Sequence, residues 1–293
     1  MKKSFGRKVF LFFNYTILVF LALTCLIPIL NQLAISFSAS SAVASGSVGL
    51  LPVDFTLDSY KYIAGKTDFW RAILVSLERI LLAVPISMTV CVLAAYPLSR
   101  ENHEFPARKY YIWVFVIPML FGGGLIPTYM VVRNTNLINT IWALVLPCAV
   151  NVFNIILLMN FIRSLPKELE EAAFVDGASY ADTLFRIILP TSKPVLATVL
   201  LFVIVNHWNS WFDGLIYLNS PEQYPLQTYL QTQVLSSSLL AMETSVDVRQ
   251  LGEISDRTGK AAQIFLAAIP VMMVYPFLQK YFTTGIVVGS VKG

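Results

Sequence analysis

Side chains that could bind a polar solute gather in one short run of an otherwise apolar segment. Asn206, Asn209 and Asp213 lie three and four residues apart, so a continuous helix would carry them on one face. Amides and carboxylates can bridge neighbouring hydroxyl groups, and the indoles of Trp208 and Trp211 are flat surfaces on which sugar rings stack. The run therefore predicts a contact site for a polyhydroxylated solute.

The same run also has a structural interpretation. Asn side chains often form hydrogen bonds between helices inside membranes, and Trp collects at the membrane boundary. For each of these residues the solute contact and the packing role both remain open.

A second polar feature is the pair Glu78 and Arg79, which lies inside another apolar segment. Counting from Arg71 at about 1.5 Å per residue puts this pair about 10 Å inside the segment. Ionisable groups at that depth usually face a cavity or a partner helix. The two side chains are expected to neutralise each other, to pair across a subunit interface or to line a solute pathway.

No combination of residues predicts catalysis or metal binding. Thr258-Gly259-Lys260 lacks the leading glycine of a phosphate-binding loop, because Ile254 stands in its place. The histidines and cysteines are not clustered with metal-ligand spacing, and an odd number of cysteines in apolar runs argues against a disulfide framework; these residues are His103, His207, Cys25, Cys91 and Cys148. We expect no catalytic residue, no metal site and no enzymatic activity, including ATP hydrolysis.

The composition predicts the elements that must position these residues. Hydrophobic residues make up 56% of the chain and charged residues 13%, against about a quarter charged in soluble domains. The net charge of +4 is too small and too scattered to indicate nucleic acid. We therefore predict an all-α, polytopic protein that contacts membrane lipid, a single domain 1–293 with six spans at about 9–33, 73–98, 110–131, 141–162, 194–218 and 261–282.

The distribution of Lys and Arg predicts the orientation. The N-terminal tail and the second and fourth connections carry more of these residues than the longer connections opposite, which by the positive-inside rule puts both termini in the cytoplasm. A cleaved signal peptide is the alternative for the first span. That stretch is too long for the apolar region of a signal peptide.

The connection 164–190 predicts two short helices joined at a glycine elbow. Ser164 is expected to cap the first helix, and Gly177 to end it in a left-handed conformation. Ser179 is expected to cap the second helix, which should end before Pro190.

Each elbow helix has an apolar face that something outside the bilayer must cover. One interpretation is a hairpin lying on the membrane or against the chain's own helices, and the other is a docking site for a cytoplasmic partner. The pattern alone does not separate them.

This segment resembles the EAA loop of permease subunits in ATP-binding-cassette (ABC) importers. The resemblance rests on Glu171, Ala172, Ala173, Asp176, Gly177, Ala178, Phe185, Ile187, Leu189 and Pro190. Three further stretches resemble the carbohydrate-uptake class of these permeases, in the branch for oligosaccharides of plant or algal polysaccharides: 121–129, 139–147 and 280–293.

The resemblance implies a heterodimer in which a second homologous permease subunit completes the pathway. It also implies two cytoplasmic ATPase subunits that bind ATP and Mg, and an extracytoplasmic binding protein that delivers the solute. This chain itself would hold no cofactor, would lie in the bacterial cytoplasmic membrane, and would contact the ATPases through the elbow residues Glu171, Ala172, Ala173, Asp176, Gly177, Ala178, Leu189 and Pro190.

Two other functions compete with this one. An ion-coupled secondary transporter needs acidic groups in its spans and usually inverted repeats; only Glu78 and Asp213 would serve, and the elbow would be unexplained. A membrane scaffold without transport predicts no polar face in the fifth span.

Overall fold

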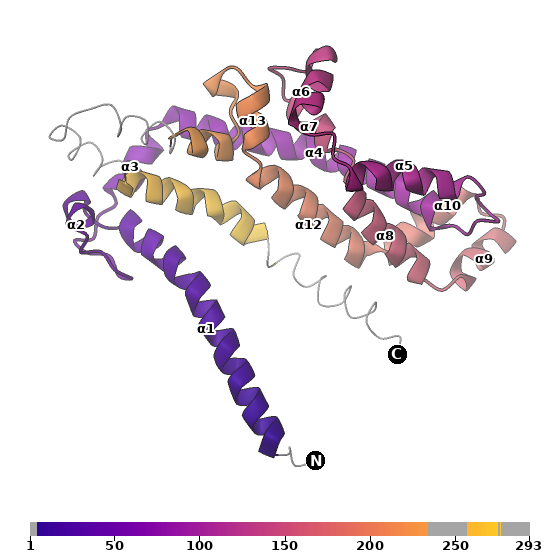
Figure 1. The fold of residues 1–293 in the computed structure, drawn as a ribbon, viewed down its shortest axis with the longest axis horizontal. Helices are drawn as coiled ribbons and strands as arrows, with labels where there is room; N and C mark the ends of the chain where they lie inside the picture. The colour runs from indigo at the N-terminus through magenta and orange to yellow at the C-terminus, as the bar shows by residue number, and fades with distance from the viewer. Residues whose placement is uncertain (1–4, 234–256, 275, 277–293) are drawn as a thin grey trace. The chain divides into compact units, whose positions relative to one another are not determined.

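The computed structural model describes residues 5–233, 257–274 and 276, which fold into helices and connecting turns without a β-strand (Figure 1). They divide into two compact units. The first joins Met1–Phe69 to Thr232–Ile269, and the second joins Trp70–Gln231 to Pro270–Gly293.

The first unit contains α1 (Phe5–Ser36), α2 (Ser40–Ala44), α3 (Asp58–Ala64) and helical residues 257–269. Side-chain hydrogen bonds order the segment after α1: Ser36 Oγ lies 2.8 Å from Tyr60 Oη, and Ser38 Oγ accepts from the Val53 amide at 3.0 Å. The Phe37 ring stacks on Tyr60 at a centroid distance of 4.9 Å. The first long connection is therefore folded.

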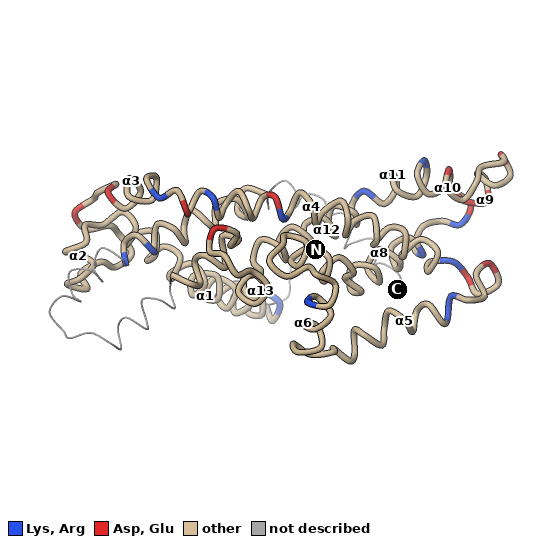
Figure 2. The backbone as a smooth tube through the Cα atoms, turned by 90° about the horizontal axis from the view of Figure 1, so that it is seen from above, with Lys and Arg blue, Asp and Glu red and all other residues tan. Residues whose placement is uncertain are grey.

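The second unit is built on α4 (Thr67–Ser99), which packs with α8 (Val152–Ser164) and α12 (Lys193–Asn209) around one apolar core. Leu158 and Val199 in that core are fully buried. Figure 2 shows that charged residues gather around α9 and α10, the elbow helices.

The predicted span 110–131 is two helices, α5 (Arg108–Leu120) and α6 (Leu125–Asn134), bent by 116°. Gly122, Gly123 and Gly124 separate them, and Gly124 has φ +80°. Such a backbone favours glycine, which has no Cβ to clash. The glycine run therefore turns the chain inside the predicted span.

The predicted span 141–162 is also interrupted. It begins as α7 (Trp142–Val145) with a 3₁₀ turn, Leu146–Cys148, and restarts as α8 after a 45° bend. The Asn151 side chain accepts from the Asn154 amide at 3.1 Å and so caps α8, as Asn does at helix starts.

The predicted span 194–218 divides into α12 and α13 (Phe212–Tyr217), because the helix ends at Asn209 and Ser210 has extended backbone. After a 3₁₀ turn, Pro221–Gln223, residues 226–233 are helical again. Thr228 Oγ1 donates to the Trp211 carbonyl at 2.8 Å and ties this segment to the break.

The elbow contains α9 (Glu168–Val175), α10 (Tyr180–Thr183), a π turn (Leu184–Ile188) and α11 (Leu189–Thr191). Gly177 has φ +83°, and Ser179 caps α10 in a capping box with Asp182, which confirms both predictions. Hydrogen bonding by Ser179 holds the pKa of Asp182 below its ordinary value.

Two local predictions about the elbow are wrong. Ser164 does not cap α9: it is the last residue of α8, where its hydroxyl donates to the Phe161 carbonyl at 2.6 Å. Pro190 does not follow the second helix but is the middle residue of α11, which continues the helical stretch Tyr180–Thr191. The chain turns instead by 82° at Ser192.

Two described helices, Gly6–Ser36 and Thr67–Ser99, are long and apolar enough to cross a membrane alone. The three bent helix pairs raise the number of spans in the described ranges to five if each pair crosses once. The sixth predicted span, 261–282, lies partly outside the described residues.

Candidate functional site

A buried polar cluster in the second unit surrounds Arg79, whose side chain is fully buried. Arg79 Nε donates to His207 Nδ1 at 3.1 Å, and Nη2 donates to the Leu144 carbonyl at 3.2 Å. Both terminal nitrogens also bond the Asp213 carboxylate, Nη1 to Oδ1 at 3.4 Å and Nη2 to Oδ2. One guanidinium thereby joins α4, α7, α12 and α13.

The Asp213 carboxylate accepts two further hydrogen bonds. Ser210 Oγ donates to Oδ1 at 2.8 Å, and the Gly214 amide donates to the same oxygen at 2.9 Å. The Asp213 side chain is 15% exposed. A buried ion pair tolerates this environment only with good geometry and additional hydrogen bonds, and both are present here.

Of the alternatives left open for Glu78 and Arg79, the Arg79 cluster does not show mutual neutralisation. Adjacent residues on a helix point in different directions, so Glu78 is exposed while Arg79 faces the interior of the unit and pairs with Asp213. The Arg79 side chain has no exposed surface, so it lines no cavity in the described part of the chain.

The predicted polar face of the fifth span is not one helical face. The helix break at Ser210 separates Asp213 on α13 from Asn206 and Asn209 on α12. Trp208 is 3% exposed and therefore belongs to the packed interior. Asn206, Asn209 and Trp211 are exposed.

In the elbow, most of the residues that carry the permease resemblance are accessible. Glu171, Ala172, Asp176, Gly177 and Pro190 are exposed, Ala178 and Leu189 are half-buried, and Ala173 is buried. Large apolar side chains stand out beside them: Val175 is 87% exposed and Phe185 61% exposed. The elbow therefore presents a charged and apolar surface that the described part of the chain does not cover.

Charged contacts attach the elbow to the end of α4. Lys167 Nζ donates to Glu101 Oε1, and this hydrogen bond lowers the pKa of Glu101 and raises that of Lys167. Arg100 bonds Glu170 on α9. Arg100 was not named as a site residue from the sequence. Its position directly after a long apolar segment was a signal that could have identified it, because a charge there marks the end of the segment.

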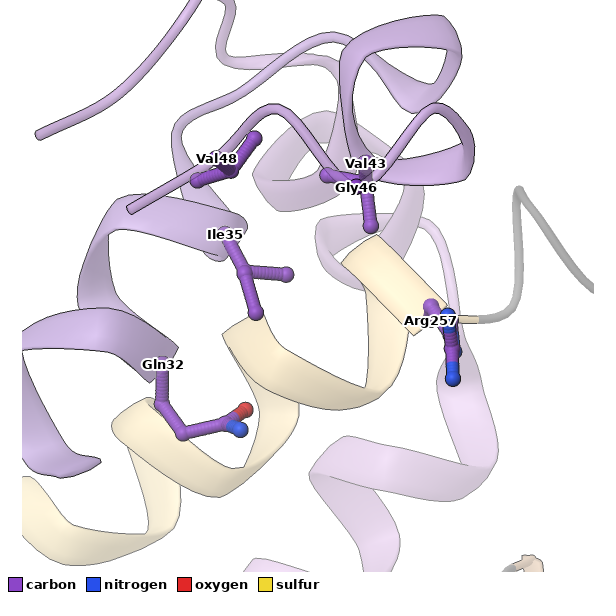
Figure 3. Close-up of a pocket in the computed structure, with 6 residues that line it drawn as sticks. All are labelled: Gln32, Ile35, Val43, Gly46, Val48 and Arg257. Carbon is purple, nitrogen blue, oxygen red and sulfur yellow. The ribbon is translucent and has the colours of Figure 1, made fainter. Parts of the chain in front are cut away.

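Cavities among the described residues include two that border named parts of the fold. One, of about 190 Å³, lies at the elbow joint and is lined by Arg100, Lys167, Glu170 and Phe174, among others. The other, of about 290 Å³, lies in the first unit, where Gln32 and Ile35 of α1 face Val43 and Val48 with Arg257 at the edge (Figure 3). Among the described residues, no group of three or more His, Cys, Asp or Glu could hold a metal ion.

The fold and elbow define a polytopic helical membrane protein with an accessible two-helix loop. Residues 62–288 match the family described as the binding-protein-dependent transport system inner membrane component. The chain belongs to this family and is a membrane-embedded permease subunit of an ABC importer, not an enzyme. ATP hydrolysis is the task of partner ATPases in this family.

Relatives match over nearly the whole chain. The polygalacturonan/rhamnogalacturonan transport system permease protein YtcP of Bacillus subtilis is 39% identical over 282 residues, 95% of this chain and 96% of its own. The diacetylchitobiose uptake system permease protein DasC of Streptomyces coelicolor is 28% identical over 298 residues, 100% of both chains.

A crystal structure matches with a TM-score of 0.85 and 31% sequence identity, covering 96% of this chain and 99% of the other. It is described as a bacterial ABC transporter involved in the import of the acidic polysaccharide alginate. These matches confirm the resemblance drawn from the elbow, and they do not support an ion-coupled secondary transporter.

Proposed function

We propose that this permease subunit forms, with a second permease subunit, the pathway for an oligosaccharide delivered by an extracytoplasmic binding protein. Two cytoplasmic ATPase subunits, which bind ATP and Mg, drive the import through the elbow at 164–190. The observation that carries the proposal is the accessible surface of α9, α10 and their joining turn, which residues 5–233 and 257–274 leave uncovered.

An acidic oligosaccharide is the first substrate to test. The 39% identical relative is named for polygalacturonan and rhamnogalacturonan, and the matching structure for acidic alginate. Reconstituted complexes should import labelled oligogalacturonate or oligoalginate faster than a neutral malto-oligosaccharide. Equal or faster import of the neutral sugar would contradict the acidic assignment and leave the importer assignment standing.

The coupling role of the elbow is tested at Glu171 and Gly177. Gly177→Val forces a β-branched residue into a backbone of φ +83°, a strain of about 1–2 kcal/mol per residue. Glu171→Ala removes an exposed carboxylate from α9. Both variants should insert normally yet lower solute-stimulated ATP hydrolysis of the reconstituted complex by about tenfold, a coupling loss of about 1.4 kcal/mol.

Each variant has a matched control. Gly46 also has a positive φ, +69°, and like Gly177 has no heavy atom within 4 Å of an added Cβ, so Gly46→Val applies the same strain outside the elbow. Glu168→Ala removes a neighbouring exposed carboxylate from α9. Both controls should keep stimulation, and normal stimulation in the Gly177 and Glu171 variants would rule out the docking role.

The proposed orientation places both termini and the elbow in the cytoplasm. In a background without Cys25, Cys91 and Cys148, a single cysteine at the exposed Ser47 should react with an impermeant maleimide added to intact cells. A cysteine at the exposed Ser179 should react only after the cells are opened. Labelling of position 179 in intact cells would invert the proposed topology.

A further inference from the structure

Arg100, directly after the last residue of α4, lies at the joint between α4 and the elbow. Its side chain is 10% exposed, although it carries a charge outside the predicted spans. A long cationic side chain is rarely so buried unless it is paired. Its partners therefore indicate what the joint holds together.

The two ion pairs of Arg100 reach different elements. Nη1 bonds Oε2 of Glu170 on α9, whose side chain is 18% exposed. The same nitrogen lies 3.7 Å from Oε2 of Glu104, four residues along the chain from Arg100 itself. Only the pair with Glu170 crosses from α4 to the elbow.

Two aromatic rings add a second link. The guanidinium carbon of Arg100 lies 4.4 Å from the ring centre of Tyr96 on α4 and 5.6 Å from that of Tyr180 on α10. Tyr180 in turn packs edge-on against Phe174 of α9 at 5.0 Å. A planar guanidinium suits such contacts, so one side chain touches the last turn of α4 and both elbow helices.

The joint has unused hydrogen-bonding capacity. Arg100 Nε and Nη2 are buried and have no hydrogen-bond partner in the described part of the chain. The cavity of about 190 Å³ borders Arg100, Glu170 and Phe174. Buried donors without partners are costly and call for an explanation. A joint in which Arg100 changes its hydrogen-bond partners when α9 moves would explain these two free donors.

Arg79 lies on α4, 21 residues before Arg100, a separation of about 30 Å at the rise of a helix. Arg79 bonds α7, α12 and α13 from the middle of α4. A displacement of α4 at its Arg100 end therefore acts on three elements around the buried cluster.

We propose that Arg100 is the positioning residue that links the coupling elbow to α4, through Glu170 and Tyr180, so that ATPase-driven movement of α9 moves the membrane helices. This inference rests on the proposed function of the elbow and names the contact through which that function reaches the membrane. Arg100 touches neither ATP nor solute.

The test uses the complete complex, with both permeases, the ATPases and the binding protein, in proteoliposomes. Arg100→Met and Glu170→Gln should leave ATP hydrolysis in place and lower the solute transported per ATP by about tenfold, within the usual range of coupling between sites. Arg100→Lys keeps the charge and loses the planar contacts, so it should restore the ratio to within about threefold.

Glu104→Gln is the matched control, because Glu104 also contacts Arg100 but does not lie on the elbow. Its transport per ATP should equal that of the wild type. A packing defect alone would lower yield and stability without changing this ratio.

Wild-type transport per ATP in both Arg100→Met and Glu170→Gln overturns the proposal, as does loss of the ATPase subunits from both purified complexes. Either result leaves the proposed function standing. A wild-type complex that binds no ATPase refutes the proposed function itself, so the two failures are distinguishable.

Discussion

Replacing Asp213 by alanine is expected to destabilise the folded permease by about 3–5 kcal/mol, because it leaves the buried guanidinium of Arg79 without its counter-charge. Arg79 is fully buried, and the remaining acceptors, His207 Nδ1 and the Leu144 carbonyl, are neutral. The apparent unfolding temperature of the detergent-solubilised subunit should fall by on the order of 10 °C.

An exposed ion pair supplies the control. Arg71 Nη1 lies 3.7 Å from Glu222 Oε2, and these side chains are 44% and 77% exposed, so Glu222→Ala should cost less than about 1 kcal/mol. Arg79→Met combined with Asp213→Ala removes both charges and should recover part of the lost stability. If Asp213→Ala unfolds at the wild-type temperature, the pair does not hold these helices together.

Local rules predicted two features of the elbow correctly and two incorrectly. Gly177 and the Ser179 capping box are determined by neighbouring residues, and both occur as predicted. The prediction for Ser164 was wrong because a hydroxyl that can cap a following helix can equally donate to the preceding turn. Here α8 extends to Ser164. Hydropathy found the apolar segments but not their breaks. One glycine or serine, such as Gly124 or Ser210, changes the mean over a span-length window too little to mark the place where a helix ends.

The partners of the buried charges were beyond sequence reasoning. Arg79 and Asp213 are 134 residues apart, and Arg100 and Glu170 are 70 apart. Nothing local relates the members of either pair, because tertiary packing of α4 against the later helices brings them together. Singling out Arg79 and Asp213 as anomalous was within reach of the sequence, but assigning them to each other required the fold.

The exposed polar groups at the end of α12 should control transport of the solute. Asn209→Leu removes a hydrogen-bonding amide and Trp211→Ala an exposed indole, and each loss is worth about 1–3 kcal/mol in a water-excluded site. Uptake by the reconstituted complex should therefore fall by about one to two decades in apparent affinity or rate, at about 1.4 kcal/mol per decade. Assembly with the partner subunits should be unchanged.

Asn160→Leu on α8 and Trp113→Ala on α5 remove the same groups from other exposed positions and should transport normally. Trp208→Ala is different in kind: its indole is 3% exposed, so that variant should lose stability before it loses affinity.

If the Asn209 and Trp211 variants lose the second permease subunit on purification, these residues pack between helices instead of touching solute. If both variants transport normally, the end of α12 lies outside the pathway. The exposed carboxylate of Glu78 then becomes the leading candidate on this chain, because an ionisable group at that depth needs water or a partner.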